Sequence, residues 1–199
     1  MRIACLGDSI TYGHGLPDLR ERWTDLAARQ TGHEFINCGL SGDTTAGMLI
    51  RCHEEVFPLT PDRVILLGGV NDIHITGEYR SACANMVSMI KHISRRGIGI
   101  IMGLPLPTYP EDIKGRPWDF ERDNRRNAEL CASLARWLKH HCADKGIPVA
   151  DFRSAFLYPD GSVRRDLLQD GVHPTAEGHR VMAEVLCKLL EQEDRERSR

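Results

Sequence analysis

Five short apolar runs along the chain predict the strands of a buried sheet. They lie at residues 2–6, 34–38, 63–67, 99–103 and 148–152, and Val, Ile and Leu are frequent in them. Unbroken apolar runs, in contrast to alternating ones, are typical of strands that are covered on both faces. Since such strands occur mainly in parallel sheets, we expect the five runs to form one.

Segments with helical periodicity separate the apolar runs. They lie at residues 16–30, 79–96 and 124–145, and a last helix is expected to begin near Thr175, a favourable N-cap residue. Gly97 and Gly146 are expected to end two of these helices. Strands that alternate with helices indicate right-handed βαβ units and a doubly wound α/β sandwich. In such folds the functional loops gather at the carboxyl ends of the strands.

One long segment, residues 104–122, shows neither pattern. It contains four prolines together with Tyr109, Trp118 and Phe120. Irregular segments of this length are usually functional or disordered, and the aromatic residues argue against disorder. Two interpretations stay open: a wall or mobile lid of a substrate pocket, or a proline-stiffened surface loop. No repeat or linker interrupts the chain, so residues 1–199 are interpreted as one domain.

The overall composition is that of an ordinary soluble globular protein. Apolar residues make up 41% and charged residues 27% of the 199 residues, and the formal net charge is -2. This balance gives no reason to expect nucleic acid or an anionic membrane surface as a partner. No apolar run approaches the roughly 18 residues of a membrane span. The composition does not predict an oligomeric state.

Seven cysteines are present, and no two of them form a Cys-x-x-Cys pair. Several, such as Cys5 and Cys187, lie in apolar runs, which is the pattern of small buried side chains in a reducing compartment. The N-terminus reaches a charged residue too early for a secretory signal peptide. A cytoplasmic location is therefore expected.

Two segments near opposite ends of the chain offer a nucleophile and a base. Ser9 lies between the first predicted strand and a glycine-rich turn, but a serine hydroxyl needs a neighbouring base to react. Asp170 precedes His173 by three positions, so its carboxylate can fold onto Nδ1 and leave Nε2 to accept the serine proton. Taken singly, the Ser9 segment is equally well explained as an ordinary turn before a helix, and the Asp170–His173 segment is better explained as one.

Two intermediate loops offer hydrogen-bond donors. Gly42 follows the second predicted strand and permits backbone N–H groups to approach a ligand closely, and Asn71 follows the third with a side-chain amide. Asp72 is a rival carboxylate, whose expected task is to accept backbone N–H bonds around the loop that aims Asn71. Four loops that each follow a strand and together supply a nucleophile, a base and oxyanion donors are hard to explain as unrelated turns.

On these residues the sequence resembles the SGNH hydrolase superfamily, also called the GDSL esterases and lipases. The four sequence blocks of that family match Gly7-Asp8-Ser9, Gly42, Gly69-Val70-Asn71-Asp72 and Asp170-Gly171-Val172-His173. The resemblance implies a flavodoxin-like three-layer α/β/α sandwich with a five-stranded parallel sheet. It also implies a triad of Ser9, His173 and Asp170.

The resemblance further implies an oxyanion hole from the backbone N–H groups of Ser9 and Gly42 and the side chain of Asn71. Asp8 and Asp72 would be supporting residues, and no metal or organic cofactor is implied. The expected activity is hydrolysis of small carboxylic esters or thioesters through an acyl-enzyme on Ser9. A carbohydrate O-acetylesterase of the same superfamily is the alternative, and the physiological substrate and acyl chain length are not predicted.

Other classes of protein fit the residues less well. A flavodoxin-like module could hold a flavin or phosphate on the hydroxyls of residues 9–12, but it leaves Asn71 and His173 without a task. An inactive binding protein would not need the complete residue set. No two histidines have the spacing of a helical metal site. His14 and His74 lie near the site loops and could touch substrate, but we interpret them as surface residues.

Overall fold

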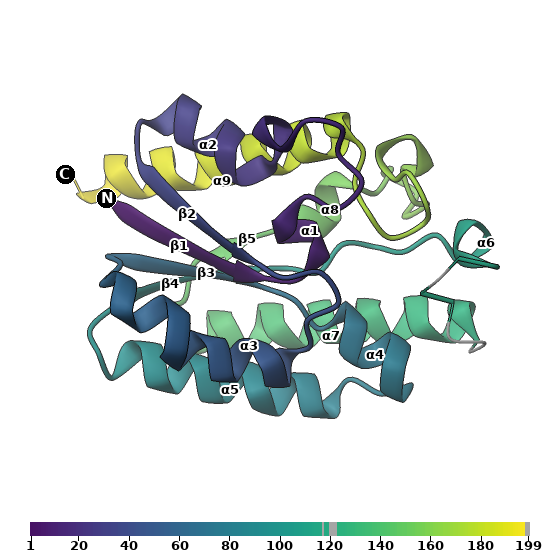
Figure 1. The fold of residues 1–199 in the computed structure, drawn as a ribbon, viewed down its shortest axis with the longest axis horizontal. Helices are drawn as coiled ribbons and strands as arrows, with labels where there is room; N and C mark the ends of the chain where they lie inside the picture. Colours follow the sequence, from purple (N-terminus) through teal and green to yellow (C-terminus); the bar gives the residue numbers. More distant parts are fainter. Residues whose placement is uncertain (117, 120–122, 198–199) are drawn as a thin grey trace.

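Helices cover both faces of a central sheet in the computed structural model, which describes residues 1–116, 118–119 and 123–197 (Figure 1). Within these residues the sheet has five parallel strands in the order β2-β1-β3-β4-β5. The strands are β1 (Arg2–Gly7), β2 (Glu34–Gly39), β3 (Arg63–Leu67), β4 (Gly99–Gly103) and β5 (Val149–Ala150). This is the flavodoxin-like three-layer sandwich that the sequence predicts.

The helices form the two outer layers of the sandwich. Figure 1 shows α2 (Trp23–Thr31) and α9 (Ala176–Arg197) on one face, with α3 (Thr45–Arg51), α5 (Arg80–Ser94) and α7 (Asn124–Ala143) on the other. Four shorter helices follow strands or loops: α1 (Ser9–Tyr12), α4 (Val70–Thr76), α6 (Pro110–Ile113) and α8 (Phe152–Ala155). A π-helical turn extends α3, and 3-10 turns lie at Leu19–Glu21, Phe57–Leu59 and Arg165–Leu167.

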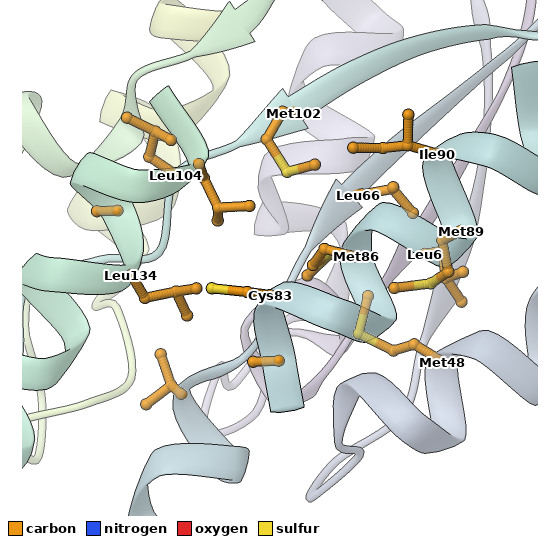
Figure 2. Packing of buried hydrophobic residues seen from close by; sticks show 14 of the residues in the cluster. Leu6, Met48, Leu66, Cys83, Met86, Met89, Ile90, Met102, Leu104 and Leu134 are labelled. Atoms are coloured by element: carbon orange, nitrogen blue, oxygen red, sulfur yellow. The ribbon is translucent and has the colours of Figure 1, made fainter. Parts of the chain in front are cut away.

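Alternate residues of each strand belong to two separate hydrophobic cores, because successive side chains of a strand point to opposite faces of the sheet. In β1, Ala4 and Leu6 face α3, α5 and α7, whereas Ile3 and Cys5 face α2 and α9. Figure 2 shows the first core, where strand residues meet Leu134 and a group of methionines. The labelled methionines are Met48, Met86, Met89 and Met102. Burial of each such side chain contributes roughly 1.5–3 kcal/mol to stability.

The predicted elements differ from the structure mainly at their ends, and five short helices, α1, α3, α4, α6 and α8, lie outside the predicted ones. The helix predicted at 16–30 begins only at Trp23, because Asp18 accepts the Arg20 N–H at 2.9 Å and caps a 3-10 turn. The strand predicted at 148–152 has two residues, because Asp151 accepts the Ser154 N–H at 3.0 Å and begins α8. Helices α3 and α4 were not predicted. The other long helices agree with the prediction to within two residues.

All seven cysteines are free, and all but Cys38 are buried. They pack in the two cores, as the apolar surroundings of Cys5 and Cys187 predicted. In the part of the chain that the structure describes, no helix is both long and apolar enough to cross a bilayer. The cytoplasmic location stays a prediction.

Candidate active site

Ser9 is the first residue of α1, directly beyond the carboxyl end of β1. Asp8 fixes this start, since its Oδ1 accepts the Ile10 N–H at 2.9 Å. Gly7 permits the tight passage from strand to helix, because a Cβ at this position would lie 2.2 Å from Thr11 Oγ1 and 2.7 Å from the Leu67 carbonyl oxygen. The local sequence therefore presents Ser9 at the edge of the sheet where functional loops gather.

His173 joins Ser9 and Asp170 in one hydrogen-bonded chain. Its Nε2 lies 2.9 Å from Ser9 Oγ, and its Nδ1 lies 2.8 Å from Asp170 Oδ2. The second carboxylate oxygen, Oδ1, accepts the backbone N–H groups of Val172 at 3.0 Å and of His173 at 2.8 Å. Ser9, Asp170 and His173 are only 7%, 6% and 5% exposed. The three side chains are thus held in a largely desolvated arrangement.

Gly171 shapes the turn that carries Asp170 and His173. Its backbone has φ +85°, and a Cβ there would lie 2.4 Å from the carbonyl oxygen of Tyr109. The Gly171 carbonyl in turn accepts the Tyr109 N–H at 2.8 Å. The segment after β4 is therefore tied to the turn that holds Asp170 and His173.

The two buried carboxyls near Ser9 have pKa values shifted in opposite directions. Burial raises the pKa of Asp170, but the hydrogen bonds from His173 and Val172 outweigh it and leave this pKa below its usual value. Asp170 is therefore ionised at neutral pH and can hold the N–H tautomer at Nδ1 of His173. Burial raises the pKa of Asp8 to about 6, and the Ile10 N–H opposes this only in part.

Asn71 and Gly42 line the same pocket as Ser9. β1 and β3 are neighbours in the sheet, so the loops after them meet where the strand order reverses. Asn71 donates one amide N–H to the Asp43 carbonyl at 2.7 Å, and an amide NH₂ has a second hydrogen to offer. Gly42 has φ +79°, a conformation that favours glycine.

Asp72 does not contact His173 but fastens the first turn of α4 to the start of α3. It accepts the Thr45 backbone N–H at 2.9 Å and Thr45 Oγ1 at 2.5 Å. Arg51 fastens the loop after β2, since it binds Asp43 Oδ2 at 2.9 Å and the carbonyl oxygens of Gly7 and Cys38. These bonds connect the loops that carry Ser9, Gly42 and Asn71.

A pocket of about 240 Å³ opens beside Ser9. Besides Ser9, its described lining combines apolar and polar residues: His14, Ser41, Gly42, Val70, Asn71, His74, Trp118, Val172 and His173. The Trp118 ring meets the His173 ring edge to face, with 5.0 Å between the ring centroids. This contact shields the imidazole on one side.

The interpretation of His14 and His74 as surface residues was wrong. His74 is 3% exposed, and His14 is partly buried with its ring centroid 4.6 Å from that of His173. Both line the pocket. His74 follows Asn71 by three positions on α4, and this spacing places two residues on one face of a helix. The position of His74 was therefore predictable once α4 was recognised.

The segment predicted at 104–122 contributes Trp118 to the pocket wall. Leu104, Leu106 and Thr108 are buried, so its first part is packed into the fold. Residues 117 and 120–122, which include Phe120, lie outside the described residues, and the lid interpretation stays a prediction.

Neither a metal site nor a flavin site is supported by the described residues. Within them, no group of three or more His, Cys, Asp or Glu side chains could hold a metal ion. Two of the three hydroxyls considered for a flavin phosphate are engaged or enclosed, because Ser9 Oγ is bound to His173 and Thr11 is 0% exposed; Tyr12 is the exposed one.

Comparison with known proteins gives a match that spans most of the chain. The sequence profile of the GDSL-like Lipase/Acylhydrolase family matches residues 5–181. An arylesterase of Vibrio mimicus is 30% identical over 106 residues, which cover 51% of this chain and 52% of that protein. The match thus spans about half the length of the arylesterase.

Two further relatives match over more of their length. An acetylxylan esterase of Geobacillus stearothermophilus is 26% identical over 180 residues, 81% of this chain and 74% of that protein. The crystal structure of a lipase/acylhydrolase from Enterococcus faecalis is similar with a TM-score of 0.75 and 28% identity, and the match covers 96% of each chain.

Proposed function

This chain belongs to the GDSL-like lipase/acylhydrolase family of ester-hydrolysing enzymes, and we propose that it cleaves small carboxylic esters through an acyl-enzyme on Ser9. The observation that carries the proposal is the chain of hydrogen bonds from Ser9 through His173 to Asp170. Its hydroxyl end faces the pocket that Asn71 and Gly42 also line. A nucleophile, an oriented base and amide donors thus meet at one cavity.

The mechanism follows from these contacts. Ser9 Oγ attacks the ester carbonyl while His173 Nε2 takes its proton, and the Asp170 carboxylate stabilises the resulting imidazolium. The N–H groups of Ser9, Gly42 and Asn71 stabilise the oxyanion, and each such donor contributes roughly 2.7–4 kcal/mol. His173 then protonates the leaving alkoxide. Water, deprotonated by His173, attacks the acyl-serine and releases the acid.

The size of the pocket favours short acyl groups. Its volume of about 240 Å³ lies below the range of about 300–1,000 Å³ of pockets that hold drug-sized ligands. Trp118 and Val172 are bulky residues of its lining. We therefore expect acetyl and butyryl esters to react faster than octanoyl esters, and the same limit applies to thioesters.

Carbohydrate O-acetylesterase is a second candidate. It is favoured by the relative named acetylxylan esterase, whose match covers most of this chain. It is also favoured by the aromatic ring of Trp118 in a pocket that contains the polar side chains of His14 and Ser41.

The proposal is tested with a fluorophosphonate probe and a set of esters. The wild type and a control variant, Ser88→Ala on the exposed face of α5, should be labelled and should hydrolyse 4-nitrophenyl acetate. Ser9→Ala should not be labelled and should lose roughly 10⁴-fold or more in kcat. Full turnover by Ser9→Ala would disprove the proposal. Acetyl, butyryl and octanoyl esters, acetyl-CoA and an acetylated xylo-oligosaccharide then rank the substrate classes.

A further inference from the structure

Two buried polar atoms of the pocket residues have no hydrogen-bond partner: His74 Nε2 and Trp118 Nε1. Buried polar atoms in folded proteins are nearly always paired, so an unpaired one needs an explanation. Other unpaired atoms of the described residues, such as those of Thr11 and His179, belong to residues away from this pocket. A shared position beside the candidate nucleophile separates His74 and Trp118 from the rest.

The chemistry of the two atoms is complementary. The indole N–H of Trp118 can only donate a hydrogen bond, while a ring nitrogen of a neutral imidazole can accept one. Burial lowers the pKa of His74, and the Trp118 backbone carbonyl opposes this in part, so the ring is neutral at neutral pH. A hydroxyl group both accepts and donates, so its chemistry suits both kinds of atom.

Other ligand groups fit the pair less well. An alkyl group would leave both polar atoms unpaired. Sites that hydrogen-bond a substrate hydroxyl reject analogues without that hydroxyl for this reason. A phosphate or carboxylate would need a cation, and none of the described residues that line the pocket is Lys or Arg. A neutral hydroxyl is the group whose hydrogen-bonding capacity matches His74 Nε2 and Trp118 Nε1.

We propose that His74 and Trp118 form a hydroxyl-recognition subsite, through which the enzyme selects esters that carry a hydroxyl close to the ester bond. This inference rests on the proposed function, and it names the substrate class of that site. The hydroxyl accepts from Trp118 Nε1 and donates to His74 Nε2. It belongs either to the alcohol portion, as in an ester of a polyol or sugar, or to the acyl portion, as in an ester of a hydroxy acid.

Matched pairs of esters test the proposal and separate the two sources of the hydroxyl. 2-Hydroxyethyl acetate is compared with propyl acetate, and methyl glycolate with methyl propanoate, by titration of the released acid. The wild type should prefer the hydroxylated member of at least one pair by about tenfold or more in kcat/KM. The pair that shows the preference identifies which portion of the substrate carries the hydroxyl.

Variants assign the preference to the two residues. His74→Phe and Trp118→Phe keep an aromatic ring but remove the polar atom, and each should reduce the preference about fivefold or more. His74→Gln retains a hydrogen-bonding group and should keep part of the preference for the hydroxylated ester. This variant also provides the test at position 74 if His74→Phe fails to fold. His92→Phe replaces a half-buried histidine on α5 that does not line the pocket, and it is the matched control, in which the preference should equal that of the wild type.

Two results would overturn the inference. Equal kcat/KM within both pairs, in a wild type that hydrolyses 4-nitrophenyl acetate, rejects the subsite but not the esterase. A preference that survives in both phenylalanine variants rejects the assignment to His74 and Trp118. Absence of hydrolysis of every ester would reject the proposed function together with the subsite.

Discussion

Asp72 accepts two hydrogen bonds from Thr45, one from the backbone N–H at 2.9 Å and one from Oγ1 at 2.5 Å. Both of its oxygens are therefore engaged in joining the first turn of α4 to the start of α3. Asp170 instead directs one oxygen to the His173 ring and the other to its own turn. Asp72 and Asp170 thus make different contacts: Asp72 joins two segments of the backbone, and Asp170 lies beside the His173 ring.

This division predicts different effects of matched substitutions. Asp170→Asn should lower kcat for 4-nitrophenyl acetate roughly 10³–10⁴-fold, because the amide no longer holds the correct tautomer of His173. Asp72→Asn keeps one acceptor for Thr45 and should cost about tenfold or less. Urea unfolding of both variants shows whether each is folded under the assay conditions. The reverse order of activities in folded proteins would exclude Asp170 as the orienting carboxylate.

Asn71→Ala should lower kcat roughly 10²–10³-fold with little change in KM, since an oxyanion donor acts mainly in the transition state. The variant also loses the bond to the Asp43 carbonyl, so a control for loop damage is needed. Asn85→Ala removes a comparable amide bond, from Asn85 Nδ2 to Thr45 Oγ1 at 3.0 Å, outside the pocket. Steady-state kinetics should show a large loss for Asn71→Ala alone; equal losses would point to loop geometry as the cause.

Most of the fold was predictable because its strands are buried on both faces. A continuous apolar run, such as residues 63–67, is a strong local signal, and β3 has those bounds. The end of β5 was not predictable from the run at 148–152, because the side chain of Asp151 starts α8 inside it. Helices α3 and α4 have seven residues each, too few to show a clear helical period.

The candidate site was predictable only in part. The sequence blocks identified Ser9, Asn71 and His173, since each follows a strand or precedes a helix in a recognisable pattern. The placement of Trp118 beside His74 depends on packing between loops that are distant in the chain, and no local periodicity reports it. The same holds for His14, whose contact with the His173 ring arises from tertiary structure alone.

Asp8→Asn should stabilise the protein at neutral pH. Burial raises the pKa of Asp8 to about 6 from its ordinary 3.8. The protonated carboxyl therefore stabilises the folded state fully below pH 3.8, and this stabilisation is lost as the pH rises through 6. Asparagine can still cap Ile10 but does not ionise. At about pH 7.5 the unfolding free energy of the variant should exceed that of the wild type by roughly 2–3 kcal/mol.

The gain from Asp8→Asn should shrink to roughly 1 kcal/mol at about pH 4.5, where the wild-type carboxyl is already largely protonated in the folded protein. Urea denaturation at the two pH values measures both differences. Asp160→Asn, which changes an exposed carboxylate in a distant turn, serves as the comparison. A gain that does not depend on pH would show that charge burial is not its cause.

His179 should make the protein sensitive to acid, with the opposite dependence on pH. Its ring is 0% exposed between α9 and α2, where Nδ1 accepts the Trp23 N–H at 3.3 Å and Nε2 has no partner. Burial lowers its pKa to about 4, whereas the unfolded chain binds this proton near the ordinary 6.5. The neutral ring therefore supports folding fully above pH 6.5, and that support is lost as the pH falls from 6.5 towards 4.

His179→Gln tests this directly, because glutamine can accept from Trp23 without taking up a proton. Between about pH 7.5 and about pH 4.5 the unfolding free energy of the wild type should fall by roughly 2–3 kcal/mol more than that of the variant. Asp8, His14 and His74 are unchanged in His179→Gln, so the difference between the two proteins isolates His179. His140→Gln, on the exposed side of α7, should follow the wild type. If the wild type and His179→Gln lose stability in parallel, the buried imidazole is not the group that links acid to unfolding.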